Sequence, residues 1–299
     1  MYFLKKYRRG VLNRYYKEMP LFERFTKDLS EGAADLRAYL KQGFKRKAIL
    51  AYPHFPSRGS TLYKIARALD MGITNHPGRK FQYVVYWEYL TFREEFALVE
   101  KLRAKYPVIN LHNRDISKER VDRIHQQIFG YNTKIDPLQY QGRAVRKSDI
   151  NAIHNYAVVN CPIDKTEPGD FYQILINNEV ENGTKVEDIR VPIIGGTLDF
   201  VYLKHRDIKV RFKNPIYCKP TPIRELLSAA EIKQIEAMAS AMHLEFGEMD
   251  VLRNRDDGQI YVIDVNNTPQ GPPGGISKED ARWAVNRMAE FFQNRLLQP

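Results

Sequence analysis

The fold of this chain is decided by residues 247–269, GEMDVLRNRDDGQIYVIDVNNTP. Two apolar runs flank a turn at residues 257–258, a pattern that predicts a β-hairpin. Asp264 and Asn266 are two positions apart and therefore face one side of the second strand, while Asp250 lies on the first strand. Mg²⁺ prefers hard oxygen ligands and takes few of them from protein. The hairpin therefore predicts a magnesium site, with an ordinary solvated turn as the alternative.

Length and composition indicate a folded protein with several subdomains. The chain has 299 residues, of which 43% are hydrophobic, enough to bury a substantial core. No apolar run approaches the roughly 20 residues that span a bilayer, and the N-terminus is too charged for a signal peptide, which favours a cytoplasmic location. Cys161 and Cys218 lack Cys-x-x-Cys spacing, so we expect two free thiols.

The net charge of +11 is concentrated at the N-terminus. Residues 1–47 contain 13 Lys and Arg against 5 Asp and Glu, a net +8, and tyrosines and phenylalanines alternate with these cations. This pattern suits peripheral association with the inner face of an anionic membrane, or an acidic partner. The alternative is a set of ordinary packed helices with solvated charges. Because no nucleic-acid-binding motif accompanies the charge, we do not expect a nucleic-acid partner.

The first half of the chain predicts a parallel sheet. Expected strands at 47–52, 82–87 and 107–111 alternate with expected helices at 61–71 and 93–105. Ligands gather at the carboxyl ends of such strands. The polar residues found there, candidates for holding an acceptor substrate, are His54, Arg58, Ser60 and Glu88. Loop residues without such a role are commoner.

The second half of the chain is richer in strands. The predicted elements before the hairpin at 247–269 are a helix at 117–129, a strand carrying Arg146 and Lys147, strands at 156–159 and 171–176, a hairpin of 188–194 and 198–203, and a helix from 223 or 229 to 242. A final helix at 278–297 follows that hairpin. We find no internal repeat.

An ATP site requires cations for phosphate, carboxylates for magnesium and an apolar slot for adenine. Lys147 ends a strand before a polar loop. Lys118 stands in the first turn of a helix, where the helix dipole disfavours a cation unless an anion binds there. Solvated surface lysines are the alternative for both. Arg190 lies in the apolar run 186–194, where burial would demand an anionic partner.

Further candidates surround these cations. Arg206, Arg211 and Asn214 follow the next strand, and arginine forks match phosphate oxygens and developing negative charge. Structural salt bridges are the alternative. Residues 172–176, YQILI, are apolar enough to form an adenine slot, although a core strand has the same composition.

In chain order these motifs resemble the ATP-grasp superfamily over about residues 45–275. The nearest likeness is to the glutamate ligases that modify a ribosomal protein, and the chain is also similar to ATP-grasp proteins of bacterial surface-polysaccharide gene clusters. The resemblance implies an α/β fold in which an N-terminal parallel subdomain precedes central and C-terminal sheet-based subdomains that bind ATP between them. The expected parts are a basic aromatic-rich extension at 1–45 and subdomains at 46–115, 116–180 and 181–299.

The resemblance also implies a role for each motif. Lys118 and Lys147 would contact nucleotide phosphates, and Gln173, Ile174 and Leu175 would form the hinge against adenine. Either Glu179 or Glu181 would hold the ribose. The catalytic contacts to phosphate or intermediate would come from Arg190, Arg211 and Asn214. Asp250, Asp264 and Asn266 would bind Mg²⁺, with aspartate at 264 where the family usually has glutamate. The loop at 148–155 lacks the glycines usual there.

The sequence therefore predicts an ATP- and Mg²⁺-dependent carboxylate-amine ligase that works through an acyl phosphate. Its partners would be a small-molecule or glycan carboxylate and an amine, in capsule or other surface-glycan synthesis. One alternative is a phosphotransferase acting on a sugar or other hydroxyl. The second is a catalytically weak scaffold on a membrane or polymer. The sequence leaves the oligomeric state open.

Overall fold

The computed structural model describes residues 47–297 apart from 151–152, 154 and 213–214, together with residues 33, 36, 37 and 40. The predicted extension at 1–45 therefore lies almost wholly outside the described residues, and so does Asn214. The chain divides into two compact units. Within the continuous described range, the first unit contains residues 47–89, 95–111 and 285–297, and the second contains 90–94 and 112–284.

The first unit contains the parallel sheet that the sequence predicts. Its strand order is β2-β1-β3-β4, all parallel. The strands are β1 (Ala48–Pro53), β2 (Gly72–Thr74), β3 (Tyr83–Trp87) and β4 (Val108–Ile109), with helices α4 (Thr61–Ala68) and α5 (Phe96–Leu102). β1 and β3 are buried apolar runs, as expected for a parallel sheet covered on both faces. Helix α9 (Lys278–Leu296) begins in the second unit and ends in the first.

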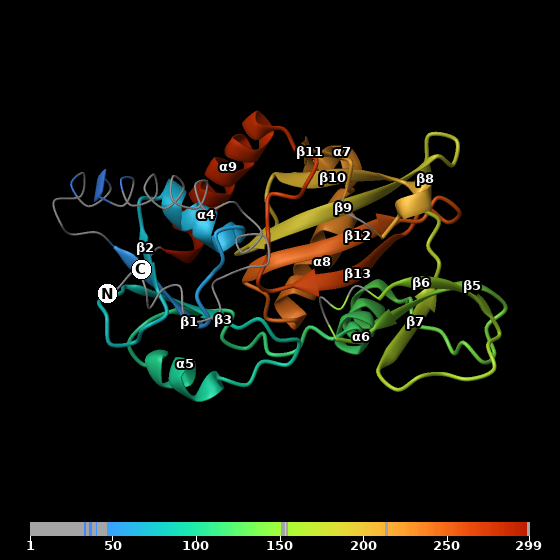
Figure 1. The fold of residues 1–299 in the computed structure, drawn as a ribbon, viewed down its shortest axis with the longest axis horizontal. Helices are drawn as coiled ribbons and strands as arrows, with labels where there is room; N and C mark the ends of the chain where they lie inside the picture. The colour runs from blue at the N-terminus through green and yellow to red at the C-terminus, as the bar shows by residue number, and fades with distance from the viewer. Residues whose placement is uncertain are drawn as a thin grey trace, which may run out of the picture. The chain divides into compact units, whose positions relative to one another are not determined.

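The second unit contains two antiparallel sheets (Figure 1). The three-stranded sheet has the order β6-β5-β7, and the six-stranded sheet has the order β11-β10-β9-β12-β13, with β8 paired to β9. The strands are β5 (Gly142–Ser148), β6 (Ala157–Cys161), β7 (Asp170–Ile174), β8 (Glu179–Val180), β9 (Lys185–Ile194), β10 (Phe200–Asp207), β11 (Tyr217–Pro222), β12 (Phe246–Arg253) and β13 (Ile260–Asn266). The helices are α6 (Lys118–Phe129), the 3₁₀ turn η1 (Ile208–Val210), α7 (Ile223–Leu226) and α8 (Ala229–Ala241).

The six-stranded sheet has one apolar and one charged face because its strands alternate with period two. On β9, Ile189, Val191 and Ile193 join a buried core to which α8 and α6 contribute. Asp188 and Arg190 alternate with these residues along the strand and line the cavity on the other face. The burial of one face fixes the register, and the second face is left to carry charge.

Capping residues fix the ends of two helices in this unit. Ser117 caps α6 by accepting a hydrogen bond from the Arg120 amide, and Gly130 ends it in the left-handed region at φ +84°. Helix α8 begins with a capping box formed by Ser228 and Glu231. The predicted helix at 117–129 is thereby confirmed.

Several boundaries differ from the sequence expectation. β2, β8 and β11 were not predicted, because the first two are only three and two residues long and β11 contains Pro220 and Pro222. Proline is tolerated in β11 because this strand ends the order of the named strands in its sheet. The helix predicted from residue 93 begins at Phe96, because residues 91–93 pair instead with 114–116.

Both cysteines match their prediction, since Cys161 and Cys218 are buried and free. None of the helices in the described ranges combines the length and apolar character that crossing a bilayer requires.

His125 is a buried histidine on α6 that should make folding pH-dependent. Its side chain is 0% exposed and stacks on Phe129 at a centroid distance of 4.2 Å. Neither ring nitrogen has a hydrogen-bond partner among the described residues. Burial lowers the pKa of His125 from 6.5 to about 4, although the charge of Asp122 acts in the opposite direction.

The unfolded chain therefore binds a proton at His125 between pH 6.5 and 4 that the folded chain does not. The contribution of the neutral, buried His125 to stability is therefore full above pH 6.5 and is lost as the pH falls toward 4, a loss of up to about 3 kcal/mol. We expect His125→Phe to remove most of this loss in urea unfolding at pH 7.5 and 5. The exposed His76→Phe should leave the pH dependence unchanged. An equal pH dependence in His125→Phe and the unmodified chain would contradict the assignment.

Candidate functional site

A cavity of about 720 Å³ lies in the second unit, against the charged face of the six-stranded sheet. Its remaining walls come from β5, β7, the first turn of α6 and the segment 270–274. The basic residues in its lining are Lys118, Lys147, Arg190, Lys204, Arg206 and Arg211, and the acidic ones are Asp188, Asp250 and Asp264. Six cations against three carboxylates give a positive excess that suits a polyanion.

A β-bulge brings Asp264 into this cavity. Asp250 pairs with Asp264, but Val251 pairs with Val262, so Ile263 is the extra residue. Val262 and Val265 both face the core although they are three positions apart. Without the bulge, Asp264 would share the face of Val262 and point into the core. The bulge thus places the apolar Ile263 and the charged Asp264 side by side in the cavity wall.

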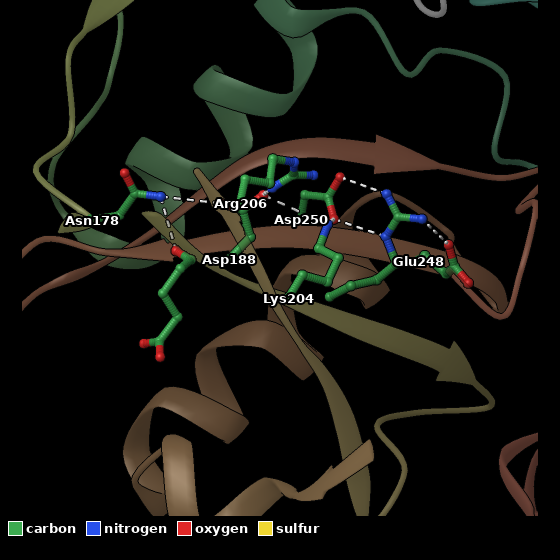
Figure 2. Close-up of polar contacts among 8 residues, drawn as sticks. Asn178, Asp188, Lys204, Arg206, Glu248 and Asp250 are labelled. Atoms are coloured by element: carbon green, nitrogen blue, oxygen red, sulfur yellow. Dashed lines mark hydrogen bonds and ion pairs between the residues drawn. The ribbon is translucent and has the colours of Figure 1, made fainter. Parts of the chain in front are cut away.

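Asp250 is held by two cations, Arg190 from the adjacent strand β9 and Lys204 from β10 beyond it (Figure 2). Arg190 donates from Nε to Oδ1 at 2.9 Å and from Nη2 to Oδ2 at 3.0 Å, and Lys204 Nζ donates to Oδ1 at 2.8 Å. Burial alone would raise the Asp250 pKa, but Arg190 and Lys204 hold it well below its ordinary value. Arg190 also pairs with Glu248 at 3.3 Å. The anionic partner predicted for Arg190 is thereby confirmed.

A second cluster lies around Asp188 (Figure 2). Its carboxylate pairs with Arg206 and accepts a hydrogen bond from Asn178 Nδ2 at 3.0 Å. The Asn178 Oδ1 atom accepts from Arg211 Nη2 at 2.9 Å. These contacts orient Arg206 through a carboxylate and Arg211 through an amide oxygen on the cavity wall.

The two predicted lysines converge on β13. Lys118 is 3% exposed, and its Nζ donates to Asp264 Oδ1 at 2.6 Å. Lys147 Nζ donates to the Ile263 carbonyl at 2.9 Å. Burial lowers the pKa of Lys147 to about 7, with the Asp264 charge acting in the opposite direction. A bound anion would favour the charged form of this lysine.

Part of the cavity lining is apolar. The apolar side chains include Val145, Leu175, Ile176, Val186, Leu252 and Ile263. Gln173 also lines this cavity, and its buried amide oxygen has no hydrogen-bond partner in the part of the chain that the structure describes. Apolar side chains together with one unsatisfied acceptor suit a base that carries an amino group.

The structure gathers most of the predicted site residues around this cavity. The predicted residues that line it are Lys118, Lys147, Gln173, Leu175, Arg190, Arg211, Asp250, Asp264 and Asn266. Ile174 packs instead against Leu252, Tyr261 and their neighbours. Glu181 is not among the lining residues, because it occupies a turn at φ +51° and pairs with Lys185 at 2.8 Å. Asn214 lies outside the described residues.

The predicted acceptor residues belong to the first unit, and two of them have structural roles there. Ser60 caps α4 by accepting a hydrogen bond from the Tyr63 amide. Glu88 is buried and accepts from the Tyr86 hydroxyl at 2.9 Å and the Glu95 amide at 3.2 Å. His54 Nδ1 accepts from the Tyr89 amide at 3.1 Å. Arg58 is half-buried.

Sequence reasoning missed Lys204 and Asn178 as site residues. Lys204 is 1% exposed and lies on β10 two positions before Arg206, so both face the cavity. That i, i+2 spacing is the signal that could have identified it, once the strand was extended past Leu203. Asn178 follows β7 in a loop and has no comparable sequence signal.

The oxygen atoms on β12 and β13 fit a magnesium ion. Asp250 and Asp264 are direct cross-strand partners, and Asn266 lies two residues after Asp264 on the same wall. Two carboxylates and one amide leave positions for water and phosphate, as Mg²⁺ requires. This donor set favours a metal shared with a ligand over a closed structural site. No cluster of three or more His, Cys, Asp or Glu suited to a metal occurs within the described ranges.

Solved structures of ATP-grasp enzymes are similar to this chain. D-alanine–D-alanine ligase from Bacillus anthracis matches with a TM-score of 0.53 and 14% identity, over 84% of this chain and 96% of that chain. A RimK domain ATP-grasp protein from Sphaerobacter thermophilus DSM 20745 matches with a TM-score of 0.50 and 11% identity, over 85% and 100%. The ATP-grasp ligase PsnB, complexed with a precursor variant, Mg and ADP, gives 0.52 and 11%, over 84% and 97%.

These likenesses show the ATP-grasp fold that the sequence predicted. No protein-family model matches the sequence, and no curated protein matches it either.

Proposed function

We propose that this chain, which has the ATP-grasp fold, is an ATP- and Mg²⁺-dependent ligase that joins a carboxylate to an amine through an acyl phosphate. One observation carries the proposal: the oxygen atoms of Asp250, Asp264 and Asn266 line the same cavity as six basic side chains. A magnesium–polyphosphate ligand needs both sets together. The solved ATP-grasp neighbours include one complexed with ATP and one complexed with Mg and ADP.

The apolar part of the lining would hold adenine, with Gln173 accepting a hydrogen bond from its amino group. Lys118, Lys147 and the arginines would hold the phosphates by charge-assisted hydrogen bonds. Asp250, Asp264 and Asn266 would hold Mg²⁺, which when bound neutralises phosphate charge and orients the γ-phosphate. Because Lys118 already pairs with Asp264, nucleotide binding would exchange this ion pair for contacts with metal and phosphate.

Arg190 and Arg211 would stabilise charge that develops as a substrate carboxylate attacks the γ-phosphate. Such donors accelerate transfer when they bind the developing charge more tightly than the ground state. Arg190 is suited to this role because its contacts to Asp250 and Glu248 hold the guanidinium in one orientation. The amine would then displace phosphate from the acyl phosphate.

Two observations suggest candidate acceptor substrates. Resemblance to the surface-polysaccharide proteins favours uronic-acid sugars or amino-acid conjugates in cell-surface glycan synthesis, within the cytoplasm. The similar structures include a D-alanine–D-alanine ligase and a ligase complexed with a precursor variant. A panel should therefore contain uronic acids, amino acids and short peptides.

We expect the purified full-length chain to release ADP and free phosphate from ATP and Mg²⁺ only when both an acid and an amine are supplied. The measurement is phosphate release with each component omitted in turn, together with mass spectrometry of the acceptors. Phosphorus retained on an acceptor would establish the phosphotransferase instead. Absence of nucleotide binding by calorimetry would favour the scaffold and overturn the enzyme proposal.

A further inference from the structure

Residues 91–93 form a short strand-like segment that braces the start of α6. The Arg93 amide donates to the Arg114 carbonyl at 2.8 Å, and the Ile116 amide donates to the Thr91 carbonyl at 3.1 Å. Phe92 and Asp115 form the antiparallel bridge between them. Residues 114–116 directly precede Ser117, the cap of α6, so this pairing fixes the backbone that leads to Lys118.

The Arg93 side chain also reaches the end of β13. Its Nη1 atom donates to the Asn113 carbonyl at 3.2 Å, and its Nη2 atom donates to the Asn267 carbonyl at 3.2 Å. The residue is 3% exposed. A buried guanidinium is costly unless it is hydrogen-bonded, and a planar fork can hold two carbonyls in a fixed relation as lysine cannot.

Asn267 is fixed through its side chain as well. Its Nδ2 atom donates to Asn113 Oδ1 at 2.6 Å, and Asn113 Nδ2 donates to the Met242 carbonyl at 2.7 Å. Asn113 and Asn267 are 1% and 0% exposed. The preceding residue, Asn266, accepts a hydrogen bond from the Thr268 amide at 2.9 Å, so the chain turns at this point.

We propose that Arg93 is a positioning residue for the magnesium end of the site. It ties the segment before Lys118 to the residue that follows Asn266, and so sets the spacing between a phosphate-binding cation and a metal ligand. The inference rests on the proposed function, because it assigns Arg93 to the Mg²⁺-dependent part of nucleotide binding. Partners that orient metal ligands typically contribute about 10- to 100-fold to metal affinity.

The alternative is that Arg93 only stabilises the fold. A comparison with Arg253 distinguishes this structural role from the positioning role. Arg253 also joins two backbone carbonyls, those of Gly258 and Leu226, at 2.8 and 2.7 Å. It pairs with Glu231 and does not line the cavity. Arg253→Met therefore serves as the matched control for Arg93→Met, because both variants keep an apolar stem.

The experiment measures ADP binding to the full-length chain by calorimetry, first in EDTA and then across a Mg²⁺ titration. The thermal midpoint of unfolding is measured for each variant as well. We expect Arg93→Met to raise the Mg²⁺ concentration for half-maximal enhancement of ADP affinity about 10-fold or more. Binding in EDTA should change less than about twofold, since the residues proposed to hold adenine are untouched. Arg93→Lys, which keeps the charge but loses the fork, should recover only part of the magnesium response.

Arg253→Met should lower the thermal midpoint and leave the magnesium response unchanged. Equal losses with and without magnesium in Arg93→Met, or a changed thermal midpoint alone, would overturn the positioning role. Should Arg93→Met fail to fold, Arg93→Lys gives the same decision, because an unaltered magnesium response there contradicts the proposal. An unmodified chain that binds no ADP, or binds it without regard to magnesium, would instead overturn the proposed function.

Discussion

Replacing Asp250 with asparagine is expected to lower the free energy of unfolding at pH 7 by about 3 kcal/mol or more. The substitution leaves Arg190 and Lys204 without the carboxylate that accepts their three hydrogen bonds. Lys204 is 1% exposed, so water solvates its ammonium poorly once the Asp250 charge is removed. Urea unfolding of Asp250→Asn beside the unmodified chain measures the effect.

The same contacts predict the pH dependence of this effect. Because the pKa of Asp250 is lower in the folded chain than its ordinary value of 3.8, the stabilisation is present above pH 3.8 and is lost as the pH falls further. The difference between the two proteins should therefore narrow in acid. Asp164→Asn, at an exposed position, is the control and should change stability by less than about 0.5 kcal/mol. A loss below about 1 kcal/mol for Asp250→Asn would contradict the predicted role of this ion cluster.

The period-two pattern made much of this site predictable from sequence. The sequence predicted a strand at 188–194, and the alternation of the buried Ile189, Val191 and Ile193 along it places Asp188 and Arg190 together on the other face. The hairpin at 247–269 was predicted from two apolar runs that flank a turn. The order of the motifs along the chain, which resembles that of the ATP-grasp superfamily, then assigned Lys118 and Lys147 to the same predicted site as these strands. Local sequence patterns were sufficient to place these residues because each of them lies within or at the end of a helix or strand.

Features that depend on pairing between distant segments could not be predicted in this way. The bulge at Ile263 is defined only by the register of β13 against β12, and the sequence IYVIDVN contains no glycine to mark it. The partners of Arg190 were predicted only as anionic, because 60 positions separate it from Asp250. The sequence predicted Arg93 as the start of a helix, because no residue near it in the sequence indicates a contact with Asn267.

Asp264→Asn is expected to reduce ligation by about 100-fold or more, and to raise the Mg²⁺ requirement for nucleotide binding by more than about 10-fold. Asparagine keeps one oxygen but removes the charge that Mg²⁺ prefers in its ligands. The measurements are phosphate release with both acceptors present and ADP binding across a Mg²⁺ titration. Full activity in Asp264→Asn would contradict a metal role for this carboxylate.

A second role for Asp264 must be separated from the first, because it is also the counter-ion of Lys118 at 2.6 Å. Asp264→Asn removes the carboxylate that lies 2.6 Å from the buried ammonium and should therefore also reduce stability. The double variant Lys118→Met/Asp264→Asn removes the ammonium as well, so we expect much of the lost stability to return. The magnesium response should stay lost, because the metal ligand is still missing. Recovery of both properties in the double variant would show that Asp264 serves only to neutralise Lys118.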